Sequence, residues 1–324
     1  MLWEPIDPDD ALRERFGFVD MAAMTRWLSS ALTRHWGLPV IAVPRVVISA
    51  DNALAWVETT AGTFVAKVCA DRERFARLDM IGDVITHLGS TGVPVPVPRP
   101  TTSGAARAQV TGSTRSLSVI LQPAVAGDLL DVTDLEAVAA AGKVLARLHT
   151  AGAAMVPALR SAGFHAGATD LHVRLHRVAH RLHRTPALER IPQPLRTLDR
   201  LLAGLPAIKG PATLVHNDFR STNILTLHSQ VTAVLDFDEM AIDYPVVDLA
   251  RAATLLNTRF TTWDPAPAAA HAAFVAGYRS ARGLSDAETA WLAAMMLALG
   301  LLQVPDGRNP EGWAESVEML AARA

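Results

Sequence analysis

The sequence predicts an α+β chain in two parts, an N-terminal part built on an antiparallel sheet and a larger, mostly helical C-terminal part. Three observations support this prediction. Apolar residues between Val43 and Val68 follow the period of strands. From Thr133 onward they recur mostly at helical spacing. Within the C-terminal part, the stretch 212–250 breaks this pattern with short apolar runs that end on acids and amides.

Composition limits the possible classes of protein. The 324 residues are enough for two lobes with a substantial core, and half of them are hydrophobic. A net charge of −2 gives no electrostatic basis for binding nucleic acid. The single cysteine, Cys69, excludes a disulfide framework and a cysteine-based zinc site. The N-terminus lacks a signal-peptide pattern and the longest apolar run, 290–302, is too short to cross a bilayer, so we expect a cytoplasmic protein without a membrane partner.

The N-terminal part is expected to begin with an irregular segment over residues 1–19. Asp20 can then cap a helix from Met21 to about Trp36, which Gly37 would end. Three strands joined by short turns follow, at 45–48, 53–58 and 63–68. The third strand carries Lys67 between two apolar residues, where a half-buried lysine needs an anionic partner unless it lies on the exposed face.

A helix over about 71–89 and a proline-rich connector complete the first part. A hairpin over 106–111 and 116–121 comes next, and the segment 122–127 has the composition of a linker. We therefore expect an N-terminal lobe over 1–121, the linker over 122–127 and a C-terminal lobe over 128–324. The helices expected in the second lobe lie near 134–150, 169–184, 193–204, 246–256, 266–281, 285–303 and 310–322.

The helix near 169–184 is locally basic. His176 and His180 are spaced as two ligands of a metal ion on one helix face would be. No acid or third ligand accompanies them, so a solvated helix face is the preferred interpretation.

The stretch 212–250 contains the candidate catalytic residues. An apolar run leads into His216 and Asp218, and Asn223 follows five residues after the aspartate. A second apolar run ends on Asp236 and Asp238. A hairpin with polar turns would also contain Asn and Asp, but it leaves these spacings unexplained. The spacing of the His, the Asp and the Asn is that of a protein-kinase catalytic loop, with a further acid at the end of the next strand.

The same stretch resembles the aminoglycoside phosphotransferase and choline kinase-like family, which are small-molecule kinases. That family shows His-Gly-Asp-x4-Asn, then Asp-Trp or Asp-Phe, then Asp-Pro-x-x-Asp-Leu-Ala; the last element corresponds here to 243–250. Asn217 replaces the usual glycine and Tyr244 is inserted before the proline, and neither change removes a chemical group. The resemblance implies a two-lobed protein-kinase-like fold that uses ATP and Mg²⁺.

The resemblance also implies roles for individual residues of the second lobe. Asp218 would orient the acceptor hydroxyl and accept its proton. Asn223 and Asp236 would bind magnesium, with Asp238 as an auxiliary ligand.

In the first lobe, the resemblance implies that Lys67 holds the nucleotide phosphates. An acid of the following helix would pair with this lysine, and Asp83 lies at a suitable distance along the chain. In the linker, the carbonyl of Gln122 and the N–H of Ala124 would bind adenine.

We therefore expect a phosphotransferase that moves the γ-phosphoryl group of ATP to a hydroxyl of a small polar molecule. An aminoglycoside-like or other antibiotic is the first expectation, and the acids between Asp236 and Asp243 favour an acceptor with an amine. The alternatives are a metabolic kinase for homoserine, choline or a sugar-like molecule, and a nucleotide-binding pseudokinase with a regulatory role. The intact Asp218, Asn223 and Asp236 argue against the pseudokinase.

Overall fold

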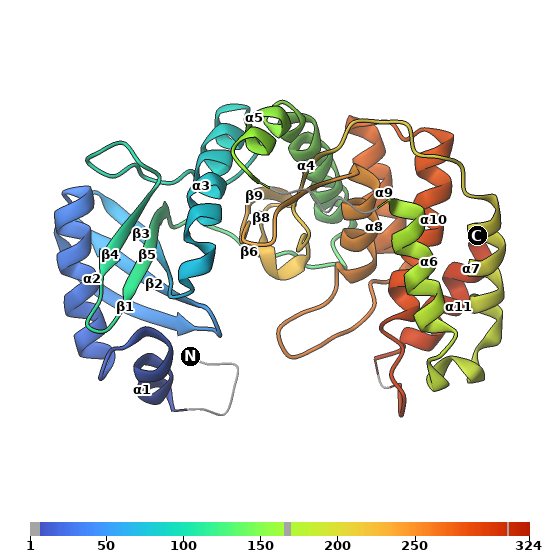
Figure 1. Cartoon of the computed structure of the whole chain (residues 1–324), viewed down its shortest axis with the longest axis horizontal. Helices are drawn as coiled ribbons and strands as arrows, with labels where there is room; N and C mark the ends of the chain where they lie inside the picture. The colour runs from blue at the N-terminus through green and yellow to red at the C-terminus, as the bar shows by residue number, and fades with distance from the viewer. Residues whose placement is uncertain (1–6, 165–169, 310) are drawn as a thin grey trace. The chain divides into compact units, whose positions relative to one another are not determined.

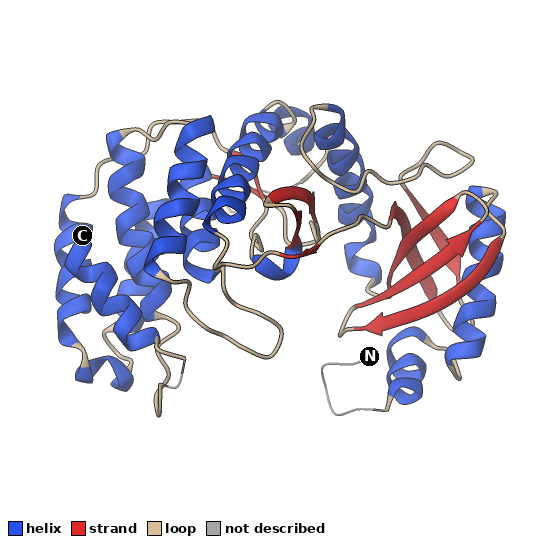
Figure 2. Cartoon of the chain, turned by 180° about the vertical axis from the view of Figure 1, so that it is seen from behind, coloured by secondary structure: helices blue, strands red, loops and turns tan. Residues whose placement is uncertain are grey.

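The computed structural model describes residues 7–164, 170–309 and 311–324. The chain divides into two compact units, Met1–Val125 and Ala126–Ala324. The first unit is built on a five-stranded sheet and the second is mostly helical (Figures 1 and 2), which confirms the predicted α+β fold class. Within the described residues, no helix is long and apolar enough to cross a membrane.

Unit 1 begins with a helical segment, so the expectation of irregular structure over 1–19 was wrong for the described residues 8–16. Helix α1 (Pro8–Ala11) continues into a π-helical turn, η1 (Leu12–Phe16). The carboxylate of Asp7 accepts the backbone N–H groups of Asp9 and Asp10, and Leu12 and Phe16 are fully buried in the core of the unit. Capping and burial therefore hold a helix too short to show a period in the sequence.

Helix α2 (Met21–Trp36) begins and ends where the sequence predicts. The Asp20 carboxylate accepts the N–H of Ala23 at 2.6 Å, and Gly37 closes the helix at a φ of 65°. Left-handed backbone of this kind is unstrained only for glycine. The buried face of α2 packs into the same hydrophobic core as the sheet (Figure 1).

The sheet of unit 1 is antiparallel, in the order β1-β2-β3-β5-β4. Its strands are β1 (Val40–Ile48), β2 (Asn52–Thr59), β3 (Gly62–Cys69), β4 (Arg107–Thr111) and β5 (Ser116–Pro123). Between β3 and β4 lie the turn η2 (Arg72–Arg74) and helix α3 (Phe75–Ser90). These elements correspond to the predicted strands, helix and hairpin; four of the strands are longer than expected, and β4 begins one residue later than predicted.

Unit 2 contains two small sheets among helices, with strand orders β10-β7 and β6-β8-β9. The strands are β6 (Asp128–Leu129), β7 (Thr213–Val215), β8 (Ile224–Leu227), β9 (Gln230–Val234) and β10 (Ala241–Asp243). The helices are α4 (Leu135–Ala153), α5 (Val156–Ser161), α6 (Leu171–Leu182), α7 (Pro192–Gly204), α8 (Pro245–Leu255), α9 (Ala268–Ala281), α10 (Asp286–Leu301) and α11 (Trp313–Arg323), with short turns η3 (Pro186–Arg190) and η4 (Ser221–Asn223).

Helices α4 and α9 approach each other closely because a glycine faces the partner backbone on each side. A Cβ atom at Gly142 would overlap the carbonyl oxygen of Phe274, and a Cβ at Gly277 would overlap that of Ala139. At the end of α4, a Cβ at Gly152 would lie 2.8 Å from the Cβ of Leu214 on β7. The glycines therefore bring α9 and the strand that leads into the polar stretch against the same helix.

Candidate active site

The polar stretch of unit 2 forms a loop between β7 and β8, with β9 returning beside it. His216, the first residue of the loop, is fully buried. Its Nδ1 accepts the N–H of Asp218 at 3.2 Å and its Nε2 donates to the carbonyl of Leu235 at 3.0 Å. The ring also packs against Phe237, with centroids 4.7 Å apart. His216 thus joins the loop to the end of β9 and organises the site rather than reacting in it.

Asp218 is held by two neighbours. Its Oδ2 accepts the side-chain amide of Asn223 at 2.7 Å. Its Oδ1 lies 2.9 Å from Nε of Arg220, which makes an ion pair although the angle is poor for a hydrogen bond. The Asp218 side chain keeps 24% of its surface exposed. The structure therefore presents an oriented carboxylate with access to solvent.

Asn223 lies at the end of the loop and is mostly buried. Its Nδ2 donates both to the carboxylate and to the backbone carbonyl of Asp218, the second at 2.8 Å. The backbone carbonyl of Asn223 accepts the N–H of Leu235 at 2.8 Å. With the amide nitrogen turned to Asp218, the amide oxygen is the atom of this side chain that is suited to a cation.

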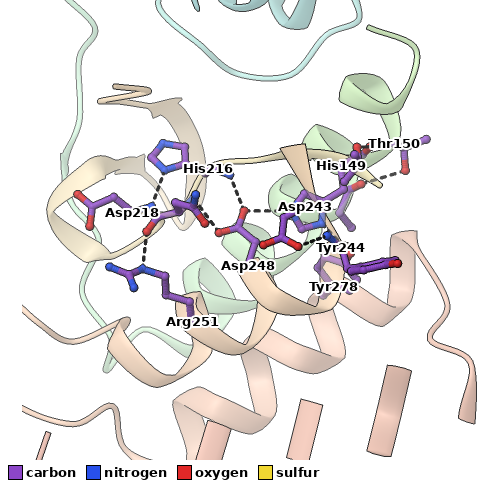
Figure 3. Close-up of polar contacts among 12 residues, drawn as sticks. His149, Thr150, His216, Asp218, Asp243, Tyr244, Asp248, Arg251 and Tyr278 are labelled. Atoms are coloured by element: carbon purple, nitrogen blue, oxygen red, sulfur yellow. Dashed lines mark hydrogen bonds and ion pairs between the residues drawn. The ribbon is translucent and has the colours of Figure 1, made fainter. Parts of the chain in front are cut away.

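The backbone of the loop is anchored from below by Asp248 on α8 (Figure 3). The fully buried Asp248 carboxylate accepts the N–H of His216 at 2.6 Å and that of Asn217 at 2.9 Å. Its other partner is Nε2 of His149 on α4, at 3.0 Å. These hydrogen bonds hold the pKa of Asp248 below its usual value despite the opposing effect of burial. Asp248 therefore fixes the loop as a buried anion.

Asn217 adopts a left-handed conformation, with a φ of 64°. Asparagine is one of the few residues other than glycine that tolerate this region. Its side-chain amide donates to the carbonyl of Glu239 at 3.0 Å, and its own carbonyl accepts Nε of Arg251 at 2.5 Å. The asparagine side chain thus adds one contact that a glycine could not make, and it keeps the left-handed backbone of the loop.

The two acids after β9 have different surroundings. Asp236 is exposed and has a φ of 59°, a conformation that turns the chain sharply at the end of the strand. Asp238 is only 8% exposed. The buried Phe237 between them packs on His216. Of the two, Asp236 has the accessibility that a ligand of a nucleotide-bound cation needs.

Asp243 is engaged elsewhere. Its Oδ2 pairs with Nη1 of Arg174 on α6 at 2.7 Å, and its Oδ1 accepts the backbone N–H of Tyr244 at 2.8 Å. Only 9% of its side chain is exposed. This acid is therefore already neutralised and gives no support to the expectation of an amine-bearing acceptor.

Within unit 1, Lys67 lies on β3, half-buried, opposite Leu54 of β2 and Ile120 of β5. Asp83 lies on α3 with an exposed side chain. Asp79, one turn earlier, is half-buried, and burial raises its pKa although Arg107 and Gln109 oppose the shift. Asp79 is thus already surrounded by partners from β4, while Asp83 remains accessible.

The two residues predicted to bind adenine lie at the end of β5 and directly after it. The strand continues past Leu121 to Pro123, and the N–H of Ala124 donates to the carbonyl of Thr63 at 3.0 Å. The side chain of Gln122 donates to the carbonyl of Pro96 at 2.8 Å. The donor predicted for adenine is therefore used by the sheet in this structure.

A comparison with protein families matches residues 43–284 to the phosphotransferase enzyme family. The chain belongs to this family. It is a small-molecule kinase, and the fold predicted from the sequence, protein-kinase-like with a sheet lobe and a helical lobe, is confirmed.

Two relatives of this phosphotransferase are homoserine kinases. The chain is 30% identical over 171 residues to the enzyme of Methylobacillus flagellatus, a match that spans 52% of this chain and 49% of that enzyme. It is 28% identical over 261 residues to the enzyme of Gluconobacter oxydans, over 76% of this chain and 75% of that enzyme.

Solved structures share the fold at lower identity. A macrolide 2'-phosphotransferase from Brachybacterium faecium has a TM-score of 0.57 at 17% identity, covering 92% of this chain and 97% of the other. An amicoumacin kinase in complex with AMP-PNP and Ca²⁺ has a TM-score of 0.56 at 14% identity, covering 92% of both chains.

Sequence reasoning missed three residues around the loop of this phosphotransferase. The proximity of Arg220 to Asp218 could have been predicted, because Arg220 lies two residues later in the same loop. Arg251 and Tyr278 gave no signal, since they come from α8 and α9 and meet the site only through tertiary packing. The pair His176 and His180 lies exposed on α6, and no cluster of three metal-binding side chains occurs among the described residues.

Proposed function

We propose that this phosphotransferase moves the γ-phosphoryl group of ATP to a hydroxyl of a small molecule, with Asp218 as the catalytic carboxylate. The observation that carries the proposal is the fixed loop: Asp218 is oriented by Asn223, and the two residues before Asp218 are tied to Asp248 through their backbone N–H groups. Phosphoryl transfer requires little covalent work from the protein, so a rigidly positioned carboxylate is the main device needed. Asp218 would accept the proton of the acceptor hydroxyl.

The residues beside Asp218 suit a magnesium ion. Asn223 offers an amide oxygen and Asp236 an exposed carboxylate, and oxygen ligands of this kind are what Mg²⁺ prefers. Asp238 is proposed as an auxiliary ligand. Bound magnesium would neutralise charge on the phosphates. The contribution of the chain is to hold these oxygens in place: Asn223 through Asp218, and Asp236 through the turn at the end of β9.

We assign the nucleotide contacts of unit 1 to Lys67, Gln122 and Ala124. Lys67 is the half-buried cation on β3 and would hold the α- and β-phosphates. Asp83 is the acid proposed to pair with it, since Asp79 has partners of its own. Adenine would use the carbonyl of Gln122 and would have to take over the N–H of Ala124 from the sheet.

For the acceptor, we propose a small hydroxylated amino acid such as homoserine. Relatives that match at 28–30% identity are homoserine kinases. The charges near the loop agree, because Arg251 approaches it while Asp243 is already paired with Arg174. A strongly cationic antibiotic would meet this arginine, and it would find fewer available acids than the sequence suggested.

The test is a survey of acceptors. Purified protein is incubated with MgATP and either homoserine, aminopropanol, choline, aminoglycosides or a macrolide, and transfer is followed by ³¹P NMR and ADP release. Homoserine should give a phosphate ester and the highest kcat/KM. Transfer to an antibiotic and to none of the other acceptors would show that homoserine is not the acceptor, while the proposed reaction would stand. Nucleotide binding without transfer to any acceptor would instead support the regulatory pseudokinase.

A further inference from the structure

A chain of buried polar groups runs from α9 to the catalytic loop (Figure 3). The hydroxyl of Tyr278 lies 2.8 Å from Nδ1 of His149, and Nε2 of the same ring lies 3.0 Å from Oδ2 of Asp248. Asp248 in turn binds the N–H groups of His216 and Asn217. The side chains of His149 and Asp248 are fully buried, and so is Tyr278. The orientation of each group therefore depends on the next.

Close packing of α4 and α9 brings Tyr278 to this place. Gly277 precedes it in the chain, and Gly142 faces it from α4, where an added Cβ would lie 2.9 Å from the backbone nitrogen of Tyr278. The two helices can approach this closely because neither glycine carries a side chain. The rings of Tyr278 and His149 then meet edge to face, with centroids 5.6 Å apart.

The donor and acceptor of each hydrogen bond follow from the groups on either side of His149, which are Asp248 and Tyr278. Asp248 remains a carboxylate, because its pKa is lowered, so it can only accept and Nε2 of His149 must donate. Burial raises the pKa of the Tyr278 hydroxyl, so it keeps its proton. The hydroxyl has Nδ1 of His149 as a hydrogen-bond partner at 2.8 Å, and it can donate to this nitrogen only where Nδ1 carries no proton.

A cation beside the ring of Tyr278, Arg282, is already paired with an acid. The Cζ atom of Arg282 lies 5.9 Å from the ring centroid of Tyr278, and its Nη2 pairs with Glu288 at 2.6 Å. Glu288 also closes a capping box with Ser285 at the start of α10. A proton on Nδ1 of His149 would point toward the hydroxyl and leave the buried Tyr278 proton without an acceptor.

We propose that Tyr278 is a positioning residue for phosphoryl transfer: by donating to Nδ1 of His149 it fixes the Nε2–H tautomer that holds Asp248, and through Asp248 the loop that carries Asp218. The kinetic part of this inference rests on the proposed function. Without the hydroxyl, the ring of His149 can place its proton on Nδ1. The Nε2 atom without a proton would then face the carboxylate of Asp248, and the two acceptors would repel each other. Asp248 would lose this hydrogen bond and would hold the loop less firmly.

The first test compares Tyr278→Phe with Tyr244→Phe, which changes the other tyrosine of the chain. Phenylalanine keeps the ring in the α4–α9 interface and removes only the donor. With the acceptor identified in the survey above, kcat should fall about tenfold for Tyr278→Phe, the effect of one buried hydrogen bond expressed in the transition state. The KM for ATP should remain within about twofold, and Tyr244→Phe should resemble the wild type. An unchanged kcat in a folded Tyr278→Phe protein would overturn the proposal.

The second test does not require activity. In ¹⁵N-histidine-labelled wild type, the ring of His149 is identified by its proximity to the ring protons of Tyr278. Its spectrum should show a protonated Nε2 and a bare Nδ1, and Tyr278→Phe should shift the ring toward the other tautomer. A protonated Nδ1 in the wild type would overturn the proposal even if the variant does not fold. Should the wild type phosphorylate no acceptor, the proposed function fails, while these spectra still decide whether Tyr278 sets the tautomer.

Discussion

The side-chain amide of Asn223 donates to the carboxylate of Asp218 at 2.7 Å. This bond couples the proposed base to the proposed metal ligand. It holds one oxygen of Asp218 in place, and it turns the amide oxygen of Asn223 away from the same carboxylate. A change in either side chain should therefore disturb both the acceptor side and the metal side of the loop.

Asp218→Asn tests the acceptor side. The substitution keeps the size of the side chain but removes its charge and its ability to accept a proton. Nucleotide affinity should be retained, while kcat should fall by about 10² or more, as for other positioned acid–base groups. Isothermal titration with a non-hydrolysable ATP analogue and steady-state kinetics measure the two quantities on the same preparation.

Asp199→Asn is a matched control, because Asp199 is an exposed acid of α7 that pairs with the exposed His183. It should leave both quantities unchanged. Full turnover in Asp218→Asn would show that this carboxylate is not the base, even though the fold is kept.

Asp236→Asn tests the metal side. Asparagine tolerates the φ of 59° at this position, so the turn is kept while the charge is lost. We expect a rise of at least about tenfold in the magnesium concentration needed for half-maximal activity, because a neutral ligand attracts the cation less. Asp238→Asn, at the more buried acid, should change the magnesium dependence less. If the two variants exchange these behaviours, Asp238 is the principal ligand.

Some elements could be predicted from the sequence because local chemistry determines them. Helix α2 has an acid cap and a terminal glycine, and both of its ends were predicted correctly. Strand β1 was predicted to begin at Arg45 but begins at Val40. Its pairing with β2 shifts register twice between Val40 and Arg45, so the alternation of apolar residues is lost there.

The surroundings of the site could not be predicted in the same way. Asp243 looked available from its place among other acids, yet Arg174 from a distant helix neutralises it. Tyr278 carries no signal in the sequence, because it meets His149 only where α9 packs against α4. Such partners are far apart in the sequence, and no spacing records which face of one helix will meet another.

Lys67→Ala tests the nucleotide side. The lysine is half-buried on β3, so alanine removes a cation from an otherwise apolar strand and should leave the sheet intact. The KM for ATP should rise and kcat/KM should fall by about tenfold or more, as expected for the loss of a charge-assisted contact with phosphate. Lys143→Ala, on the exposed face of α4, serves as the control. Wild-type constants for ATP in both variants would remove Lys67 from the site.

His271 on α9 should make the stability of the protein depend on pH. It is buried, and no described group lies within hydrogen-bond reach of its Nε2. Burial, aided by the nearby Arg323, lowers the pKa of this histidine from 6.5 to about 4. The unfolded chain therefore binds a proton between these values that the folded chain does not. The free energy of unfolding should thus fall as the pH drops from 6.5 to about 4.

The expected loss is about 2 to 3 kcal/mol by pH 4.5, from the size of the shift. Urea unfolding at pH 7, 5.5 and 4.5 measures it, with His271→Leu as the variant that cannot titrate and His180→Leu as a control on the exposed face of α6. His271→Leu should lose less stability than the wild type over this range, and His180→Leu should follow the wild type. Asp248, whose pKa is lowered from 3.8, contributes stability above that value and loses it only at lower pH, outside this range. Parallel curves for the wild type and His271→Leu would show that His271 can take up its proton without unfolding.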